Sequence, residues 1–157
     1  DQNIKIKLGE NHIVIKDNAT ELTSQLLEGK YPEYENYIPK EFSLTMEMNR
    51  DELESSVRKA DIMTSQETHL VRFIFNTEDK MITMKSKCLD RGTSEITMHL
   101  ESAEGTDMTV GFNARHILEA LKILDKADLS WKIKEDPGPG EFAEEGYKYV
   151  FMPVKMK

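Results

Sequence analysis

Four histidines, one cysteine and many carboxylates are the residues that could support catalysis or metal binding. The histidines, His12, His69, His99 and His116, share no metal-ligand spacing, and the chain has neither an HExxH nor a CxxC motif. Cys88 has no histidine close to it in the sequence, no serine lies in a GxSxG motif, and the Gly-Pro-Gly run is not a GxxxxGK[ST] phosphate loop. The sequence therefore predicts no catalytic residue, no metal and no cofactor.

The carboxylates lie in short runs such as DELE and EFAEEG, which usually belong to a solvated face or a helix N-terminus. Two functional classes stay open at this point. One is a small cytosolic α+β enzyme whose site surrounds His116 and the loop from Asp136 to Phe142, with an acidic residue as general acid or base. The other is a structural adaptor. A tight cavity that holds a histidine and a carboxylate would favour the enzyme.

Basic residues recur on the exposed sides of two predicted helices. The first helix carries Arg50, Arg58 and Lys59, and the second carries Arg115, Lys122 and Lys126. Neighbouring acids favour simple solvation, whereas two helices aligned beside nucleic acid would give a salt-sensitive attraction that ignores base sequence. The formal net charge of -8 argues against a surface coated with phosphate-binding groups. It does not exclude a basic face on an acidic body.

A change in apolar spacing predicts these two helices. Asn49 is a good N-cap for a helix from about Arg50 to Ile62, and Asn113 is a good N-cap for the second helix. The apolar stripes comprise Leu53, Val57 and Ala60 on the first helix, and Ile117, Leu118, Leu121 and Leu124 on the second. Each stripe covers one side of its helix and is expected to face a core.

Alternating patterns predict strands over most of the remaining chain. Residues 4–17 predict a hairpin, and residues 20–29 a third extended segment. Another strand begins at Phe42, and later strands are predicted in LVRFIFN, KMITMKSK, SEITMHLE, DMTVGF and LSWKIKED. The acidic, proline- and glycine-rich EDPGPGEFAEEG is predicted to be a loop. The order of elements indicates an α+β unit with a hint of internal duplication.

Two segments break this regularity. Residues 31–40 contain Pro32 and Pro39 and no periodic pattern, so they are predicted to connect two domains. The end of the chain, YVFMPVKMK, is unusually apolar for a terminus. Either Tyr149 to Met152 form a last strand that Pro153 terminates, or the end is offered to a partner.

Composition sets the class of protein. The 157 residues suit one domain, or one domain and part of another, and a hydrophobic content of 38% is enough for a core. No apolar run approaches the roughly 18 residues of a membrane span. A single cysteine is compatible with a reducing compartment, so a cytoplasmic location is expected. The chain begins at Asp1 and enters a strand pattern at once, which suggests a fragment.

Three collinear stretches, EGKYPEYENYIPKE, VGFNARHILEALKIL and YVFMPVKMK, resemble the bacterial sliding clamp family, the β subunit of the replicative DNA polymerase. They follow the family patterns G-[KR]-[FY]-P-[DE]-Y, [IV]-G-F-N before a helix, and a terminal Y-V-x-M-P-[MV]-[RK]. The resemblance implies a DNA-clamp fold with two helices on an antiparallel β-sheet layer. Residues 1–30 resemble the last strands of the second clamp domain, residues 31–40 the interdomain connector, and residues 41–157 the third domain.

The resemblance also implies a function. Members of the family form a ring of two head-to-tail subunits, which encircles double-stranded DNA with helices inside and tethers the polymerase for processive synthesis without catalysing a reaction. The residues expected to face DNA are Arg58, Lys59, Arg115 and Lys122. A homodimer is implied for a full-length clamp, and a monomer is expected for this chain alone. Cofactors and membranes have no part in the implied function.

A peptide groove is implied at the C-terminus, where the family binds short peptides from polymerases, the clamp loader and repair proteins. The matching positions are Pro32, Asn36, Tyr37, Asn113, His116, Val150, Met152, Pro153, Val154 and Lys155. Methionine and proline suit this use, because a thioether adapts to different ligands and a proline presents a rigid face. Asn36 and Tyr37 replace an arginine and an aliphatic residue of the family pattern, and Lys157 extends past its usual end.

Ile62 and Met63, at the end of the first predicted helix, resemble the family's contact with the first domain of the next subunit. The alternative is that both residues complete the apolar stripe of the helix and belong to the core.

Overall fold

A computed structural model describes residues 4–31, 33–134 and 138–156. The chain divides into two compact units, Asp1–Tyr34 and Glu35–Lys157, and the division falls within the segment predicted to connect two domains. Among the described residues, no helix is long and apolar enough to cross a membrane.

The first unit is an antiparallel sheet in the order β1-β2-β3, built from β1 (Lys5–Leu8), β2 (His12–Lys16) and β3 (Glu21–Gln25). The predicted hairpin and third extended segment are confirmed. Ile6, Ile15 and Leu22 lie opposite one another on one face of this sheet. Ile6 is 67% and Leu22 58% exposed, so much of this apolar face is open to solvent.

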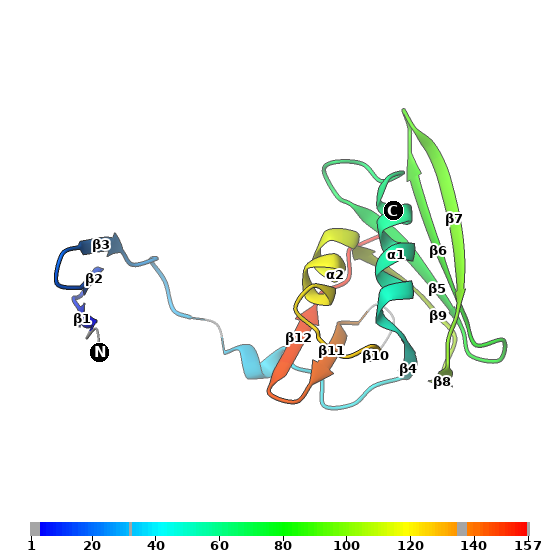
Figure 1. The fold of residues 1–157 in the computed structure, drawn as a ribbon. Helices are drawn as coiled ribbons and strands as arrows, with labels where there is room; N and C mark the ends of the chain where they lie inside the picture. The colour runs from blue at the N-terminus through cyan, green and yellow to red at the C-terminus, as the bar shows by residue number, and fades with distance from the viewer. Residues whose placement is uncertain (1–3, 32, 135–137, 157) are drawn as a thin grey trace. The chain divides into compact units, whose positions relative to one another are not determined.

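The second unit contains both helices and strands β4 to β12 (Figure 1). A short 3-10 turn, η1 (Tyr34–Asn36), spans the division between the two units. The helices are α1 (Arg50–Asp61) and α2 (Ala114–Leu121). The strands are β4 (Leu44–Asn49), β5 (Leu70–Asn76), β6 (Met81–Cys88), β7 (Gly92–His99), β8 (Ser102–Gly105), β9 (Met108–Asn113), β10 (Asp128–Ile133), β11 (Gly140–Glu144) and β12 (Tyr147–Phe151).

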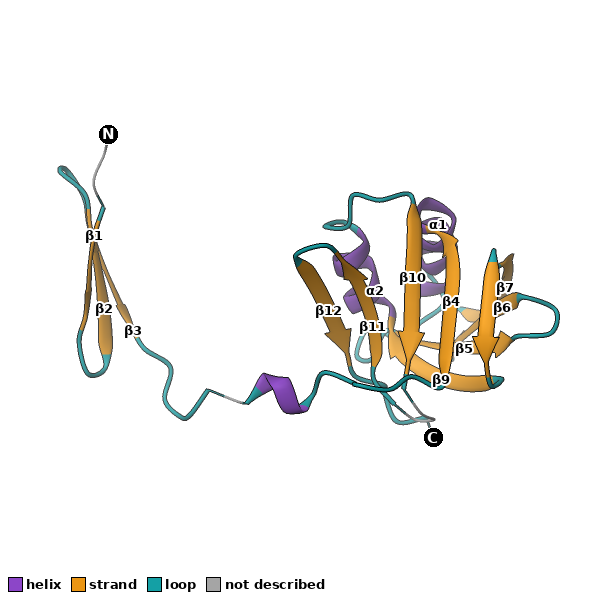
Figure 2. Ribbon diagram, turned by 90° about the horizontal axis from the view of Figure 1, so that it is seen from below, coloured by secondary structure: helices purple, strands orange, loops and turns teal. Residues whose placement is uncertain are grey.

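Two antiparallel sheets form this unit, in the orders β12-β11-β10-β4-β8 and β7-β6-β5-β9 (Figure 2). The hinted duplication is confirmed in the order of elements. We call β4, α1, β5, β6 and β7 the first half, and β9, α2, β10, β11 and β12 the second half. Each half contributes its first strand to the sheet of the other half, because β4 pairs with β10 and β9 pairs with β5.

The strand registers align the two halves residue by residue. Asn49 ends β4 as Asn113 ends β9, and Met48 lies opposite Leu129 as Phe112 lies opposite Val71. With the registers of β6 on β5 and of β11 on β10, the matched positions are Phe73 and Trp131, Arg72 and Ser130, and Met84 and Phe142. Lys85 follows Met84 as Ala143 follows Phe142, so we match these two residues as well.

The two halves share one core. Phe73 and Trp131 are matched positions, both are fully buried, and their ring centroids lie 5.2 Å apart in a T-shaped contact. Phe112 of the second half also packs against Phe73, and Trp131 packs against Phe75 of the first half. Edge-to-face aromatic contacts of this kind stabilise a core beyond the area that they bury. The aromatic cluster therefore joins the halves at their centre.

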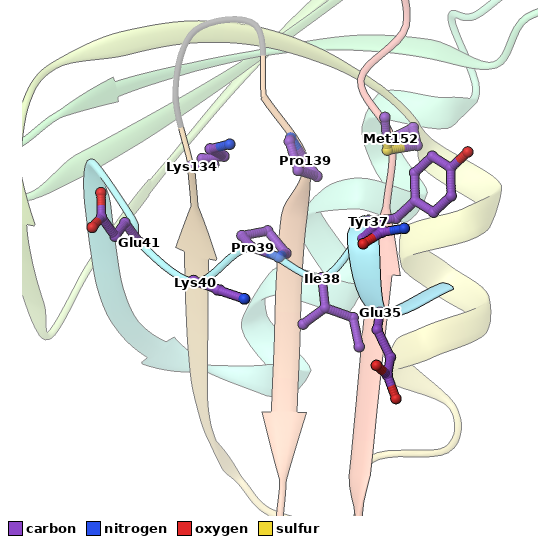
Figure 3. Close-up of a pocket in the computed structure, with 10 residues that line it drawn as sticks. Glu35, Tyr37, Ile38, Pro39, Lys40, Glu41, Lys134, Pro139 and Met152 are labelled. Carbon is purple, nitrogen blue, oxygen red and sulfur yellow. The ribbon is translucent and has the colours of Figure 1, made fainter. Parts of the chain in front are cut away.

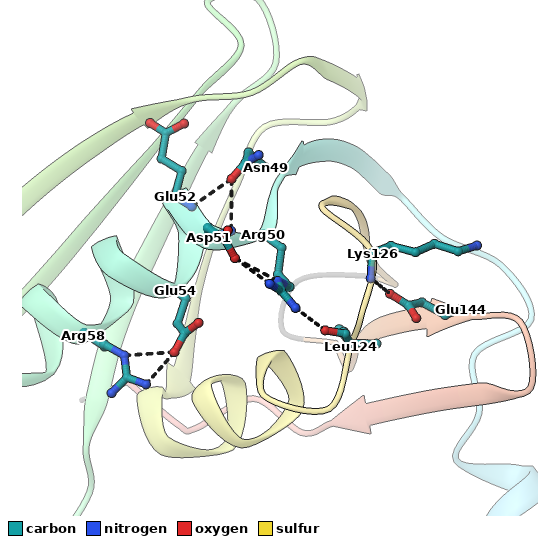
Figure 4. A network of polar contacts seen from close by, with 9 residues as sticks. All are labelled: Asn49, Arg50, Asp51, Glu52, Glu54, Arg58, Leu124, Lys126 and Glu144. Carbon is teal, nitrogen blue, oxygen red and sulfur yellow. Dashed lines mark hydrogen bonds and ion pairs between the residues drawn. The ribbon is translucent and has the colours of Figure 1, made fainter.

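Helices α1 and α2 lie side by side over the strands (Figure 1). The predicted caps are confirmed, since Asn49 accepts hydrogen bonds from the backbone N–H groups of Asp51 and Glu52, and Asn113 accepts one from Arg115. The Arg50 guanidinium donates to the carbonyl of Leu124 and is paired with Asp51 at 2.7 Å (Figure 4). Arg50 thus ties the start of α1 to the segment that follows α2.

Several sequence predictions of the elements were wrong in detail. The predicted loop EDPGPGEFAEEG contains β11, which forms because Phe142 is buried 5.2 Å from Trp131 and Gly140 leaves room for the Phe151 ring. Strand β8 was not predicted, since its four residues carry no alternating pattern. The last strand spans Tyr147–Phe151 rather than Tyr149 to Met152.

Candidate functional site

An open hollow of about 520 Å³ lies in the second unit beside the segment Glu35–Glu41. Residues 35–41 line it together with Lys134, Pro139 and Met152 (Figure 3). Lys134 follows β10, Pro139 precedes β11 and Met152 follows β12. The hollow is therefore built where the ends of three neighbouring strands meet a segment about a hundred residues earlier in the chain.

The hollow combines apolar surface with balanced charge. Tyr37 is 59% and Met152 56% exposed, and Figure 3 shows the Tyr37 ring beside the Met152 side chain. Pro39 is buried and anchors the segment. Two acids and two lysines of the lining, Glu35, Glu41, Lys40 and Lys134, carry charge around this apolar surface. An exposed aromatic ring next to an exposed thioether is a surface that gains free energy when an apolar group covers it.

Two hydrogen bonds hold the surroundings of the hollow in place. The backbone N–H of Ser43 donates to the carbonyl of Ile133 at 2.9 Å, which fixes the end of the segment to β10. The N–H of Val154 donates to the carbonyl of Gly111 at 2.7 Å, which fixes the residues after Met152 to β9. A Cβ at Gly111 would lie 2.9 Å from Met156, so glycine lets the tail pass closely. Met152 is thus held between the core residue Phe151 and an anchored tail.

Helices α1 and α2 present the predicted basic residues to solvent. Arg58, Lys59, Arg115 and Lys122 are all exposed. Arg58 pairs with Glu54 one turn earlier, while Lys122 is the C-cap residue of α2. α1 carries Asp51 and Glu52 in its first turn and Arg58 and Lys59 in its last turn. The helix layer is therefore locally mixed in charge rather than uniformly basic.

Comparisons with known proteins decide the family. Residues 35–155 match the family model of the DNA polymerase III beta subunit, C-terminal domain. The chain belongs to this family. Over 156 residues the chain is 27% identical to the beta sliding clamp of Synechocystis sp., covering 98% of the chain and 40% of that relative. The chain spans about 40% of the length of the curated relatives that it matches.

Solved structures show the same fold. The DNA polymerase III beta subunit of Pseudomonas aeruginosa matches 97% of the chain and 42% of its own length, with a TM-score of 0.82 at 19% identity. A sliding clamp of the same organism bound to griselimycin matches 98% of the chain and 42% of its own, with a TM-score of 0.79 at 19% identity. The predicted DNA-clamp fold, with two helices on antiparallel sheets, is confirmed.

The structure brings together only part of the groove set predicted from the resemblance to the beta subunit family. Asn36, Tyr37 and Met152 line one hollow. Pro32 lies outside the described residues, as does Lys157. The other predicted groove residues, Asn113, His116, Val150, Pro153, Val154 and Lys155, are not among those that line it. Asn113 has a structural task as the N-cap of α2.

Seven lining residues and one neighbour of α2 were not predicted as site residues. The seven carry no recognisable pattern of a site, and they are Glu35, Ile38, Pro39, Lys40, Glu41, Lys134 and Pro139. Tyr149 of β12 is half-buried, and burial is the main cause that raises its pKa, followed by the charges of Glu119 and Tyr147. Glu119 lies on α2, and residues of α2 lie close to residues of β12.

Ile62 and Met63 differ in their surroundings. Ile62 is 61% exposed at the C-cap of α1, which rules out the alternative that it completes the core stripe. Met63 is half-buried. The guanidinium of Arg91 donates to the Ile62 carbonyl at 3.3 Å and orders the turn. An exposed isoleucine on a fixed turn is available for contact with another chain.

The features expected of an enzyme do not assemble around His116. His116 is exposed on α2 and does not line the hollow, and Asp136 of the proposed loop lies outside the described residues. Within residues 4–31, 33–134 and 138–156, no group of three or more His, Cys, Asp or Glu residues could hold a metal ion. The family match and the open hollow favour membership of the beta subunit family over the enzyme alternative.

Proposed function

We propose that this chain acts as part of a non-catalytic sliding clamp, which encircles double-stranded DNA and tethers the replicative polymerase in the cytoplasm. The observation that carries the proposal is the family match over residues 35–155, together with the fold that it requires. In this proposal residues 1–30 belong to the second clamp domain, residues 31–40 are the connector and residues 41–157 are the third domain.

The helix layer would face the DNA. Arg58 and Lys59 of α1, with Arg115 and Lys122 of α2, are exposed on neighbouring helices and would attract phosphates through a sequence-independent, salt-sensitive interaction. Mixed charge on these helices suits a surface that must bind DNA weakly enough for it to slide. Water between the side chains and the phosphates would keep sliding easy.

The hollow beside Tyr37 and Met152 would receive short peptides from polymerases, the clamp loader and repair proteins. Its apolar surface supports this role, because a peptide with large apolar side chains would cover the ring and the thioether. Asn113, His116, Val150, Pro153, Val154 and Lys155 would frame the neighbouring part of the groove. The Pseudomonas aeruginosa clamp bound to griselimycin provides a compound with which to test this surface.

Ring formation would need a first domain to meet Ile62 and Met63. The proposed state of this chain alone is therefore a monomer, whereas a full-length clamp would form a head-to-tail homodimer. The exposed side chain of Ile62 supports this contact. Light scattering checks the monomer, and a stable ring-sized species formed by this chain would contradict it.

A binding titration tests the peptide site. The probes are griselimycin and a fluorescein-labelled peptide that contains an adjacent leucine and phenylalanine. Met152→Ala should weaken binding of the labelled peptide about tenfold, because it removes the most exposed apolar side chain contributed by the tail. Its thermal unfolding should stay close to that of the unmodified chain, since Met152 is not part of the core.

Leu89→Ala is the matched control. Leu89 is an exposed apolar residue, 92% accessible, in the turn after β6, and it does not line the hollow. Equal affinity of Met152→Ala and Leu89→Ala for the peptide would contradict the proposed groove. Deletion of residues 152–157 is a less clean variant, because it also removes the hydrogen bond between Val154 and Gly111.

A further inference from the structure

A second hollow, of about 450 Å³, lies on the sheet of the first half. Arg72 of β5, Lys85 and Lys87 of β6, and Glu95 of β7 contribute its charged side chains, and Leu70 contributes apolar surface. Five hydroxyl-bearing residues complete the lining: Ser65, Thr68, Ser86, Thr93 and Ser94. Three cations and one carboxylate give this hollow a formal charge of +2 (3 − 1), on a chain whose net charge is -8.

The cations of this hollow are incompletely neutralised. Lys85 is paired with Glu95 at 3.0 Å. Arg72 lies directly opposite Lys85 in the register of β5 and β6, and like charges at such positions repel each other. Arg72 and Lys87 are exposed, and neither forms an ion pair with another of the described residues. The repulsion between these cations costs free energy, and a bound anion would reduce it.

Backbone alternation separates these cations from the core. Val71, Phe73, Met84 and Ser86 point inward and are buried, while Arg72, Lys85 and Lys87 point to the opposite face. The hydroxyl of Ser86 donates to the carbonyl of Ala60, so it is already used within the fold. Thr93 is exposed and also lines the hollow, so its hydroxyl can donate to a ligand.

The matched positions in the second half show that the fold does not require these charges. Arg72 corresponds to Ser130 and Lys85 to Ala143, both uncharged, although the strands pair in the same order. The two cations are therefore an addition to the scaffold of the first half. A guanidinium offers two parallel donors that fit the oxygens of a phosphate, and a nearby ammonium adds a point charge.

We infer that the hollow lined by Arg72, Lys85 and Lys87 binds the phosphate group of a phosphate ester. Arg72 donates to two of its oxygens, Lys87 supplies the second charge, and Lys85 remains paired with Glu95 at the side of the site. Leu70 provides an apolar contact for the organic part of the ester. This site is distinct from the peptide hollow and from the helix layer, and it does not depend on the clamp function.

NMR titration of the whole isotope-labelled chain tests the site. The probes are inorganic pyrophosphate, thymidine monophosphate and a short single-stranded oligothymidylate. Backbone amide shifts are expected in residues 65–72, 85–87 and 93–95. Shifts of similar size confined to other parts of the chain would overturn the inference.

Three variants distinguish specific binding in this hollow from non-specific attraction of an anion to positive charge. Arg72→Ser, which copies the matched residue of the second half, should weaken binding roughly tenfold, and Lys87→Asn should weaken it less. Lys126→Ala is the control, because it removes one exposed charge away from the hollow. Either of the first two variants serves if the other fails to fold. Equal effects of all three variants would show that binding is non-specific and would overturn the inference.

The probes also distinguish the two sources of the phosphate. Binding of thymidine monophosphate as tight as that of the oligomer identifies a small phosphate ester as the ligand. Tighter binding of the oligomer, with a log-log salt slope that Arg72→Ser reduces by about 0.7, identifies the backbone of single-stranded nucleic acid. Failure of all three probes to bind would overturn the inference.

Discussion

The two halves of the second unit have the same order of helices and strands, but their solvent-facing surfaces differ. In the first half, β5 and β6 carry Arg72 and Lys85 on the face away from the core. In the second half, the matched residues are Ser130 and Ala143, and the nearby ends of β10, β11 and β12 take part in the hollow with Tyr37 and Met152. One half thus offers a surface with excess positive charge, and the other takes part in a surface that combines exposed apolar groups with balanced charge.

This difference indicates which strand positions of the fold can change residue type without changing the fold. Most inward positions of both halves are apolar and contribute to one aromatic core, so a change there affects the whole unit. Outward positions such as Arg72 and Lys85 are exposed, and they can acquire charge or apolar surface without altering the strand order. Side chains that could bind a ligand lie on the outward face of each half, whereas the inward faces form one common core.

The largest expected effect tests the shared core. Phe73→Ala should lower the free energy of unfolding by about 3–5 kcal/mol, because it leaves a cavity against Trp131. Trp131 is the only tryptophan, so its fluorescence reports on the second half although the substitution lies in the first. Urea unfolding followed by fluorescence and by circular dichroism should show the same shifted midpoint.

Independent halves would give another result. In that case the fluorescence transition would stay at its original midpoint while the circular dichroism transition moved, and the single core would be disproved. Phe73→Leu gives the same comparison with a smaller cavity if the alanine variant does not fold.

An intermediate loss of unfolding free energy is expected when either helix N-cap side chain is removed, and its size should differ between the two caps. Asn49 accepts from two backbone N–H groups, at 3.0 and 3.1 Å, whereas Asn113 accepts from one at 2.9 Å. Asn49→Ala should therefore cost about 1–2 kcal/mol and Asn113→Ala about 0.5–1 kcal/mol. Urea midpoints measure both values, with Asn49→Asp as the control that keeps an acceptor. A larger loss for Asn113→Ala would show that the hydrogen-bond count does not rank the caps.

The smallest effect concerns alkaline pH and belongs to the second half. Burial raises the pKa of Tyr149, so the folded state holds this proton more tightly than the unfolded state. The resulting stabilisation is complete below the unfolded-state pKa of about 10 and is lost as the pH rises through the folded-state value. Tyr149→Phe should reduce the fall of the urea midpoint above about pH 10. An unchanged alkaline profile would contradict this role.

Much of the fold could be predicted from the sequence because local patterns encode it. Asn49 followed by apolar residues at helical spacing gave α1 to within a residue at its end, and alternation gave β5 and β6. Strand β11 was missed because its glycine and acidic residues are typical of a loop. The buried rings of Trp131 and Phe151, which belong to the two flanking strands, pack against Phe142 of this segment.

The candidate site was less predictable, and distance along the chain is the reason. The resemblance to the clamp family pointed to Tyr37 and Met152, and the structure places both in one hollow. Lys134 and Pro139 join them only because β10 and β11 end there, which no local pattern indicates. The cations opposite each other on β5 and β6 likewise depend on the register of the strands.

The exchange of first strands between the halves has a consequence for biosynthesis. Met48 of β4 pairs with Leu129 of β10, which leaves the ribosome 81 residues later (129 − 48). At about 5–20 residues per second, β4 waits about 4–16 s for this neighbour. During that time Leu44, Met46 and Met48, which are buried in the finished protein, are without their final cover. Apolar strands exposed in this way are prone to aggregate, and a slower ribosome would lengthen their exposure.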